Sequence, residues 1–354
     1  MHRYDLIRVD RIHAASRSSL ANPDVATGRN SMTSARTETT RSVGDEPNEA
    51  SVKRHVQELE SELQNFSEIA SRLVPEPGEL PRLDGFEIHG ETMPLSGVLG
   101  GDHLIYLDFK QRYDLDARAR RAFAQGRPEV AAKLEDSRRR AGIVLADVSG
   151  HRITDALLGA MLHQAFVLGV GYELDIFGEV TKSLFENLNT RFYKSSSVRK
   201  FITMIYGEVI EDGRFRFVSA AHPAPILFSA REDRFVDAKP EDSLTCPPLG
   251  TMPSRFEIDR TRLDQPLGFK GEFVVNQWRL ANPGDILVLC TDGLIEHETD
   301  TQTYFPARLE HRVRELKTHR AAEMVAGIKE DLLSFAPPAD DISLVVIKRT
   351  HEEI

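Results

Sequence analysis

Strand-like segments outnumber helical segments in this chain, and the helices come in pairs between groups of strands. Strand-like apolar runs cover 86–93, 103–109, 142–147, 201–210, 214–221, 224–229, 272–280, 285–293 and 342–349. Helical patterns cover 153–169, 175–192, about 306–317 and about 320–334. A doubly wound parallel sheet would place a helix after each strand. The observed order therefore predicts antiparallel sheets with the helices outside them, which is an α+β fold.

The N-terminal part of the chain divides into two segments of different character. Residues 1–50 are rich in Ser, Thr, Arg, Asn and Asp and have little apolar periodicity, so we expect a disordered tail. Residues 51–75 are expected to be a helix, because apolar residues recur over 52–73 at alternating spacings of four and three. Such a heptad helix either lies on its own domain or forms a short coiled coil that makes a homodimer. The pattern alone does not choose between them.

Charge and cysteine content exclude several classes of protein. The net charge of −10 and the pI of about 5.7 argue against a nucleic-acid partner, because such binders neutralise phosphates. No uninterrupted apolar run approaches the roughly 18 residues of a membrane span. Cys246 and Cys290 have no CxxC spacing, so they indicate reduced thiols. We therefore expect a cytoplasmic protein without a membrane span.

Aspartates stand beside turn residues at four places where an apolar strand meets a loop. They are Asp102 after two glycines, Asp147, Asp292 before a glycine, and Asp340 with Asp341. A buried carboxylate is costly unless it is paired, and several in one pocket cannot all stay ionised without a cation. An all-oxygen donor set suits Mg²⁺ or Mn²⁺ and disfavours zinc. If the strand ends converge, two such ions could clamp a phosphoryl group and activate a water molecule.

The motifs GGD, ADVSGH, FITMIYGEV, AAHPAPIL, PPLG, LANPGDILVLCTDGLIE and PADDISLVVI occur in this order along the chain. In order and spacing, the chain resembles the metal-dependent serine/threonine protein phosphatases of the PPM, or type 2C, class. The resemblance is strongest to the bacterial branch that contains stage II sporulation protein E (SpoIIE) and RsbU. It covers residues 84–349. It implies a four-layer α-β-β-α sandwich with two antiparallel sheets, with residues of about 110–140 as an insertion.

The resemblance also implies which groups would bind two Mn²⁺ or Mg²⁺ ions. Asp147 would bridge the two ions, with the backbone carbonyl of Val148 as a ligand beside it. Asp292 and Asp340 would complete the first ion site. Asp102 would reach the second ion directly or through water.

Other residues of these motifs have open roles. Asp341 would either stabilise the metal ligands without binding an ion itself or bind a weaker third metal. His151 could act as the general acid for the leaving alkoxide. Arg152 stands where the family usually has glycine, so it either contacts the substrate phosphate or distorts the turn. We interpret His222 as a structural residue.

The implied function is hydrolysis of phosphoserine or phosphothreonine on a protein by a water molecule that two metal ions activate. In the resembled branch the usual substrate is a phosphorylated anti-sigma-factor antagonist, a STAS-type protein. A pseudophosphatase that binds a phosphoprotein without turnover is the alternative, supported by Arg152 and opposed by the complete set of aspartates. The hypothesis of a nucleotide-handling enzyme rests only on the GGD tripeptide, and no P-loop motif is present.

The insertion at about 110–140 contains ten Lys or Arg residues and a helical segment over 128–140. It directly follows the strand that begins beside Asp102, so we expect it to project close to the catalytic face. It is either a solvated charged helix or an element that docks an acidic or phosphorylated partner.

Overall fold

The computed structural model describes residues 49–71, 80–95, 100–150, 153–195, 200–237, 239–255, 257, 260–263 and 265–350. Almost all of the expected disordered tail lies outside these residues, and so do His151 and Arg152. The division of the chain into two units falls between His55 and Val56. The fold described below belongs to the second unit.

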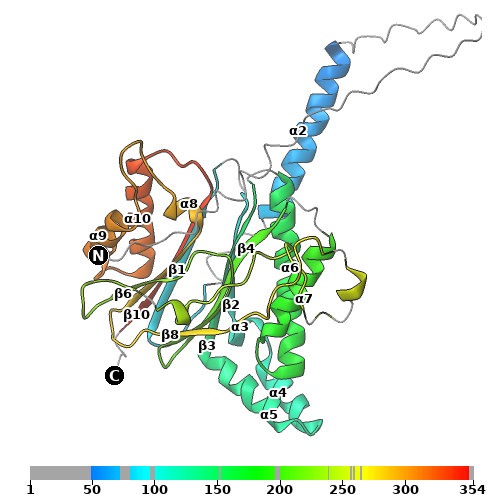
Figure 1. The fold of residues 1–354 in the computed structure, drawn as a ribbon, viewed down its shortest axis with the longest axis vertical. Helices are drawn as coiled ribbons and strands as arrows, with labels where there is room; N and C mark the ends of the chain where they lie inside the picture. Colours follow the sequence, from blue (N-terminus) through cyan, green and yellow to red (C-terminus); the bar gives the residue numbers. More distant parts are fainter. Residues whose placement is uncertain are drawn as a thin grey trace, which may run out of the picture. The chain divides into compact units, whose positions relative to one another are not determined.

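The described strands form two five-stranded antiparallel sheets (Figure 1). The first sheet has the order β1 (Phe86–Met93), β10 (Ile342–Arg349), β9 (Ile286–Cys290), β6 (Ile226–Ser229) and β7 (Arg234–Val236). The second has the order β2 (Asp102–Asp108), β3 (Arg140–Val148), β4 (Ile202–Ile210), β5 (Arg214–Ala220) and β8 (Asn276–Arg279). The antiparallel α+β prediction is confirmed.

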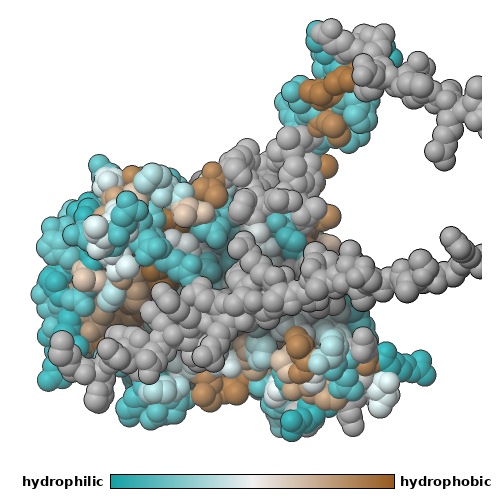
Figure 2. Space-filling model, turned by 45° about the horizontal axis from the view of Figure 1, so that its top comes forward, coloured by the Kyte–Doolittle hydropathy of each residue, from teal (hydrophilic) through white to brown (hydrophobic). Residues whose placement is uncertain are grey.

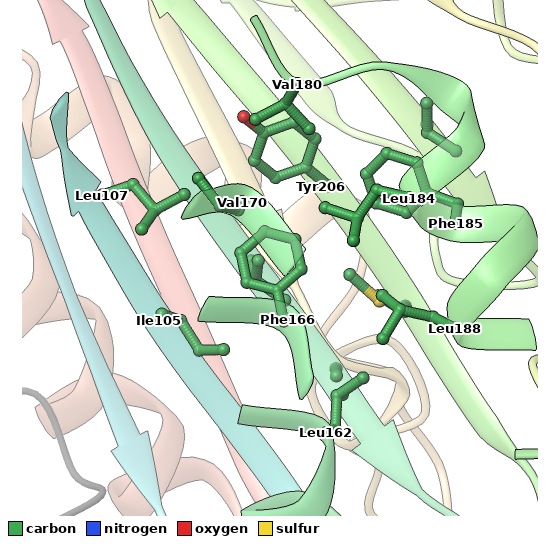
Figure 3. Close-up of a cluster of buried hydrophobic side chains, with 14 of the residues drawn as sticks. Ile105, Leu107, Leu162, Phe166, Val170, Val180, Leu184, Phe185, Leu188 and Tyr206 are labelled. Atoms are coloured by element: carbon green, nitrogen blue, oxygen red, sulfur yellow. The ribbon is translucent and has the colours of Figure 1, made fainter. Parts of the chain in front are cut away.

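The two sheets pack face to face, and helices cover both outer faces. Alternate residues of a strand point to opposite faces of its sheet. Leu104 of β2 therefore faces the other sheet, while Ile105 and Leu107 face α6 (Ile153–Phe177) and α7 (Lys182–Ser195). Figure 3 shows the apolar cluster between the second sheet and these two helices, with Phe166 of α6 between the strands and α7. On the first sheet, α9 (Ala307–Leu316) and α10 (Ala321–Phe335) form the outer layer. The four-layer α-β-β-α sandwich is confirmed.

Helix α6 has apolar residues on both of its faces. Leu162, Phe166 and Val170 are fully buried against the second sheet, whereas Leu168 and Tyr172 on the outer face are exposed. By length and composition alone, Asp155–Phe177 could cross a membrane, and it is the one such helix in the described part of the chain. A core helix with an apolar outer face passes the same test, so this is weak evidence for a membrane span.

The boundary between α6 and α7 differs from the predicted one. The second helix was expected to begin at residue 175, but α6 continues to Phe177 and α7 begins only at Lys182. Gly178 ends α6 with a φ of 74°, a conformation that glycine adopts without strain. Glu173 then accepts hydrogen bonds from the amide and the hydroxyl of Thr181, at 2.9 and 2.6 Å. These bonds shape the turn before α7.

The insertion consists of α3 (Phe109–Arg112), α4 (Leu115–Ala124), α5 (Pro128–Asp136) and a 3₁₀ turn, η3 (Ser137–Arg139). In the β2–β3 pair, Asp102 lies opposite Asp147 and Asp108 lies opposite Ala141. The insertion therefore leaves β2 at the end remote from both aspartates. The expectation that it projects close to the catalytic face is wrong, because β2 runs away from Asp102 before the insertion begins.

The insertion packs on the C-terminal end of α6. Arg118 and Arg121 form ion pairs with Asp175, and Arg127 donates to the backbone oxygen of Asp175 at 2.9 Å. Leu134 of α5 is fully buried in the same core as α6. Several of the basic residues thus have partners within the chain. These contacts favour the structural interpretation of the insertion over the docking one.

The long loop between β7 and β8 includes two 3₁₀ turns, η4 (Pro240–Asp242) and η5 (Arg260–Arg262), and it is anchored to α7. Lys270, whose side chain is fully buried, donates to Glu186 of α7 at 2.8 Å and lies 3.8 Å from the centroid of the Phe273 ring. Glu186 also accepts from the Phe273 amide at 2.8 Å, so this amide donates to a side chain rather than to a neighbouring strand. Strand β8 is accordingly shorter than the predicted 272–280.

The heptad segment forms helix α2 (Glu49–Ser71), described here by itself. Val52, Val56, Leu59 and Ile69 are all exposed. Figure 2 shows apolar side chains along this helix with hydrophilic ones beside them. The predicted helix at 51–75 is present as far as Ser71, and residues 72–79 lie outside the described part.

Candidate metal centre

The two sheets bring the predicted aspartates to one edge of the sandwich. Asp102 at the start of β2 lies opposite Asp147 near the end of β3. Asp292 opens the short helix α8 (Asp292–Ile295) just after β9, and Asp340 and Asp341 precede β10, the neighbour of β9. A side-chain hydrogen bond joins the two sheets here, from the Thr291 hydroxyl to Asp102 Oδ2 at 2.7 Å.

Asp341 is held by backbone amides. Its Oδ1 accepts from the Leu95 amide and its Oδ2 from the Gly101 amide, both at 2.6 Å. The carboxylate lies directly against Gly100, where no side chain would fit. Each oxygen of Asp341 therefore already has a donor, and the residue fixes the loop that leads into Asp102.

Asp102 is almost completely buried, with 4% of its surface exposed. Burial raises its pKa well above the usual range, and the charge of Asp147 raises it further. Hydrogen bonds from the Thr291 and Ser343 side chains lower it only in part. The Thr291 hydroxyl is itself fixed by the Ser343 amide, which donates to it at 2.9 Å.

Asp147 has the most strongly coupled environment of the set. Burial raises its pKa to about 7, and the charges of Asp292, Asp340 and Asp341 add to the rise. The pKa of Asp292 is raised by burial and then by Asp340. These mutual effects show that the carboxylates share one electrostatic environment.

No protein cation balances these charges within the described part of the chain. No described Lys or Arg forms an ion pair with any of the five aspartates. Two histidines, His103 and His222, lie near them, but burial lowers the pKa of each to about 3, so both rings are neutral. His222 instead makes a 3.0 Å hydrogen bond with the hydroxyl of Thr203, which lies opposite Asp147 in the sheet.

Gly101 leaves room for a cluster of oxygens. A Cβ atom on this residue would lie 2.5 Å from the Gly150 carbonyl oxygen, 2.6 Å from that of Val148 and 3.4 Å from Asp147 Oδ1. The Val148 amide donates to the Gly101 oxygen at 3.1 Å, which fixes the two segments together. Three oxygens therefore line the space that a side chain would fill, and Val148 supplies one of them.

The donor set fits hard divalent cations. It consists of carboxylates and backbone carbonyls only, which are the ligands that Mg²⁺ and Mn²⁺ prefer. As the side chains stand, no three His, Cys, Asp or Glu groups of the described residues are already placed to hold one ion. Binding of an ion would therefore require some of these side chains to rearrange.

Sequence reasoning missed Gly101 and Thr291 at this site. The double glycine before Asp102 was a visible signal for Gly101. Thr291 beside Asp292 gave none, because a threonine in that position is ordinary at a strand end. His151, the predicted general acid, lies outside the described residues.

Comparison with known proteins places the chain in a family. Residues 137–350, more than half of the chain, match the family described as stage II sporulation protein E (SpoIIE). The chain belongs to the SpoIIE family. The phosphoserine phosphatase RsbU of Bacillus subtilis (strain 168) is 26% identical over 213 residues, 58% of this chain and 55% of RsbU. RsbP of the same organism, also a phosphoserine phosphatase, is 35% identical over 85 residues, 24% of this chain and 21% of RsbP. This SpoIIE-family chain thus spans about half the length of RsbU and a fifth of RsbP.

Solved structures share the fold of this SpoIIE-family chain. The SiaA-PP2C domain of Pseudomonas aeruginosa matches with a TM-score of 0.55 at 13% identity, covering 83% of this chain and 98% of that domain. The RsbU and RsbW domains of Rv1364c from Mycobacterium tuberculosis match with a TM-score of 0.54 at 22% identity, covering 77% and 62%. At such identities the likeness establishes the PP2C fold and nothing further.

Proposed function

We propose that this chain is a metal-dependent protein phosphatase that hydrolyses phosphoserine or phosphothreonine on a protein. The observation that carries the proposal is the cluster of five aspartates at one edge of the sandwich: Asp102, Asp147, Asp292, Asp340 and Asp341. No described lysine or arginine forms an ion pair with any of them. Family membership adds to it, since the curated relatives RsbU and RsbP are named phosphoserine phosphatases.

Each donor has a proposed role at a pair of Mn²⁺ or Mg²⁺ ions. Asp147 would bridge the two ions, with the carbonyl oxygen of Val148 as a ligand beside it, and Asp292 and Asp340 would complete the first site. Asp102, whose Oδ2 accepts from the Thr291 hydroxyl, would reach the second ion directly or through water. The bound ions would supply an activated water molecule and neutralise the phosphoryl oxygens.

The remaining residues position these donors. We propose that Asp341 holds the loop before Asp102 rather than binding a third metal, because both of its oxygens accept backbone amides. His151 remains our candidate for protonating the leaving alkoxide.

The proposed substrate is a phosphorylated anti-sigma-factor antagonist of the STAS type, carried over from the family resemblance. We place the reaction in the cytoplasm, as the two free, buried thiols of Cys246 and Cys290 suggest. We further propose that α2 pairs with a second copy through its exposed apolar residues, which include Val56 and Leu59. Sedimentation should then show a dimer for the full chain and a monomer for Leu59→Glu. A monomeric wild type would rule out this pairing.

Phosphate release from a phosphoserine peptide and from an aryl phosphate tests the activity. We expect release with Mn²⁺, none with a chelator, and a loss of at least about 100-fold in Asp147→Asn. The matched control is Asp285→Asn, a buried aspartate at the other end of β9 that accepts from the Ala230 and Asn282 amides. It should keep Mn²⁺-dependent release. Folded wild type that binds Mn²⁺ but releases no phosphate from either substrate would contradict the hydrolase and favour the phosphoprotein-binding alternative.

A further inference from the structure

A buried ion pair lies under the turn that follows Asp147. Lys200, just before β4, pairs through Nζ with Asp155 in the first turn of α6. The Asp155 side chain is fully buried, while 30% of the Lys200 side chain is exposed. Separating a buried carboxylate from the cation of its ion pair is costly.

Lys200 also binds the turn itself. Its Nζ donates to the Ser149 carbonyl oxygen at 2.9 Å. The backbone oxygen of the next residue, Phe201, accepts from the Ser149 amide at 3.0 Å, and the Phe201 amide donates to Ser149 Oγ at 3.1 Å. Three hydrogen bonds thus fasten Ser149 to residues 200 and 201.

The ion pair packs against Gly150. This glycine has a φ of 114°, and a Cβ atom on it would lie 2.6 Å from Asp155 Oδ2 and 3.0 Å from Lys200 Nζ. The carbonyls of Val148 and Gly150, on either side of Ser149, are two of the oxygens that line the space beside Gly101. Backbone carbonyls in a turn can rotate, so their common direction needs a fixed point, and Ser149 is the residue between them.

We propose that Lys200, anchored by Asp155, is a positioning residue that holds the Val148–Gly150 turn with its carbonyl oxygens directed at the metal pocket. It acts through Ser149 and is not a ligand. The inference rests on the proposed function, because it assigns Lys200 to the metal centre of that reaction.

The test uses a double variant that leaves the net charge of the pair unchanged. Lys200→Met with Asp155→Asn removes one positive and one negative charge, so the net charge stays the same while the anchor of Ser149 is lost. The matched control is Lys270→Met with Glu186→Gln, which breaks a second lysine–carboxylate pair with a fully buried lysine, between the β7–β8 loop and α7. Its glutamine still accepts from the Phe273 amide.

Two measurements are compared in full-length protein. In metal-free protein we expect hydrogen exchange of the Val148 and Ser149 amides to quicken at least about tenfold in the Lys200 double variant and to be unchanged in the control. By calorimetry we expect the Mn²⁺ Kd to rise about tenfold in the first and stay at the wild-type value in the second. Lys200→Arg, which retains donors for both oxygens, should keep both values within about threefold.

Wild-type exchange and Kd in the Lys200 double variant would overturn the inference. Equal losses in the Lys270 control would also overturn it, because they would show general destabilisation. A wild-type protein that binds Mn²⁺ without releasing phosphate would refute the proposed function alone. If wild type binds no Mn²⁺, the metal centre is refuted, and the exchange of the metal-free protein still decides whether Lys200 holds the turn.

Discussion

The two ends of strand β3 gather charged side chains in opposite ways. At the end of Asp147, five carboxylates meet and no described lysine or arginine pairs with them. At the other end, two carboxylates meet three cations. These residues are Glu179 and Glu208 with Lys133, Arg140 and Arg216.

The difference shows in the pKa values. Burial alone would raise the pKa of Glu179, but hydrogen bonds from Lys133 and Arg140 outweigh it and lower the pKa. Arg140 Nη1 lies 3.3 Å from Glu179 and 3.5 Å from Glu208. At Asp147, burial acts together with neighbouring carboxylates and the pKa rises to about 7. Burial acts at both ends, and the ends differ in whether cations of the protein balance the carboxylates.

The largest expected effect comes from filling the oxygen-lined space with Gly101→Ala. The new Cβ would lie 2.5 and 2.6 Å from two carbonyl oxygens, which are backbone atoms that must shift with the whole turn. We expect the Mn²⁺ Kd to rise about 100-fold, measured by calorimetry. Gly171→Ala makes the same change in α6, with nothing within 4 Å of the new atom, and should leave the Kd unchanged. Unaltered binding in Gly101→Ala would place the ions elsewhere.

The pH dependence of stability should have opposite signs at the two ends. The folded pKa of Asp147 is above its unfolded value of about 4, so this group lowers stability as pH rises from about 4 to 7. Between pH 5 and pH 7.5 the loss in chelator should be about 2 to 3 kcal/mol, because one pKa unit corresponds to about 1.4 kcal/mol and only part of the rise falls in this interval.

Denaturation in chelator at pH 5 and pH 7.5 measures this effect. Asp147→Asn should lose less stability than wild type over the interval, and Mn²⁺ should restore wild type at the higher pH. The lowered pKa of Glu179 gives stability that is present above about pH 4 and is lost in stronger acid. Equal pH dependence in wild type and Asp147→Asn would contradict the assignment to Asp147.

The smallest expected effect on Mn²⁺ binding is that of Arg140→Met at the balanced end. It removes a charged hydrogen bond to Glu179, which keeps Lys133. It also removes the cation beside the carboxylate of Glu208, which keeps the hydrogen bond from the Tyr206 hydroxyl. Because only 4% of the Glu208 side chain is exposed, we expect a loss of about 3 kcal/mol of unfolding free energy. The Mn²⁺ Kd should stay within about twofold. If Arg140→Met had normal stability but weakened Mn²⁺ binding, the two ends of β3 would not act independently.

Much of this edge could be predicted because turn chemistry and apolar runs mark where strands end. Asp102, Asp147, Asp292 and Asp340 were found from those signals, and antiparallel pairing then brings the first two opposite each other. The strand and helix order also predicted the sheets and their outer helices. These features depend on local sequence, so they can be recognised without coordinates.

Other features depend on contacts between distant segments. Asp155 resembles any acidic residue in a first helical turn, and nothing near Lys200 in the sequence indicates its partner. The predicted position of the insertion was wrong because Asp102 is close to it in sequence but lies at the opposite end of β2. Gly178 likewise ends α6 later than the apolar pattern suggested.

The remote position of the insertion has a practical consequence for protein engineering. Between α4 and α5 the chain turns at Gln125 and Gly126, both exposed, and a Cβ on Gly126 would meet nothing within 4 Å. Exposed turns of this kind tolerate added sequence. A fluorescent reporter or an affinity tag inserted at this turn would lie beyond the end of β2 and β3 that is remote from the aspartates.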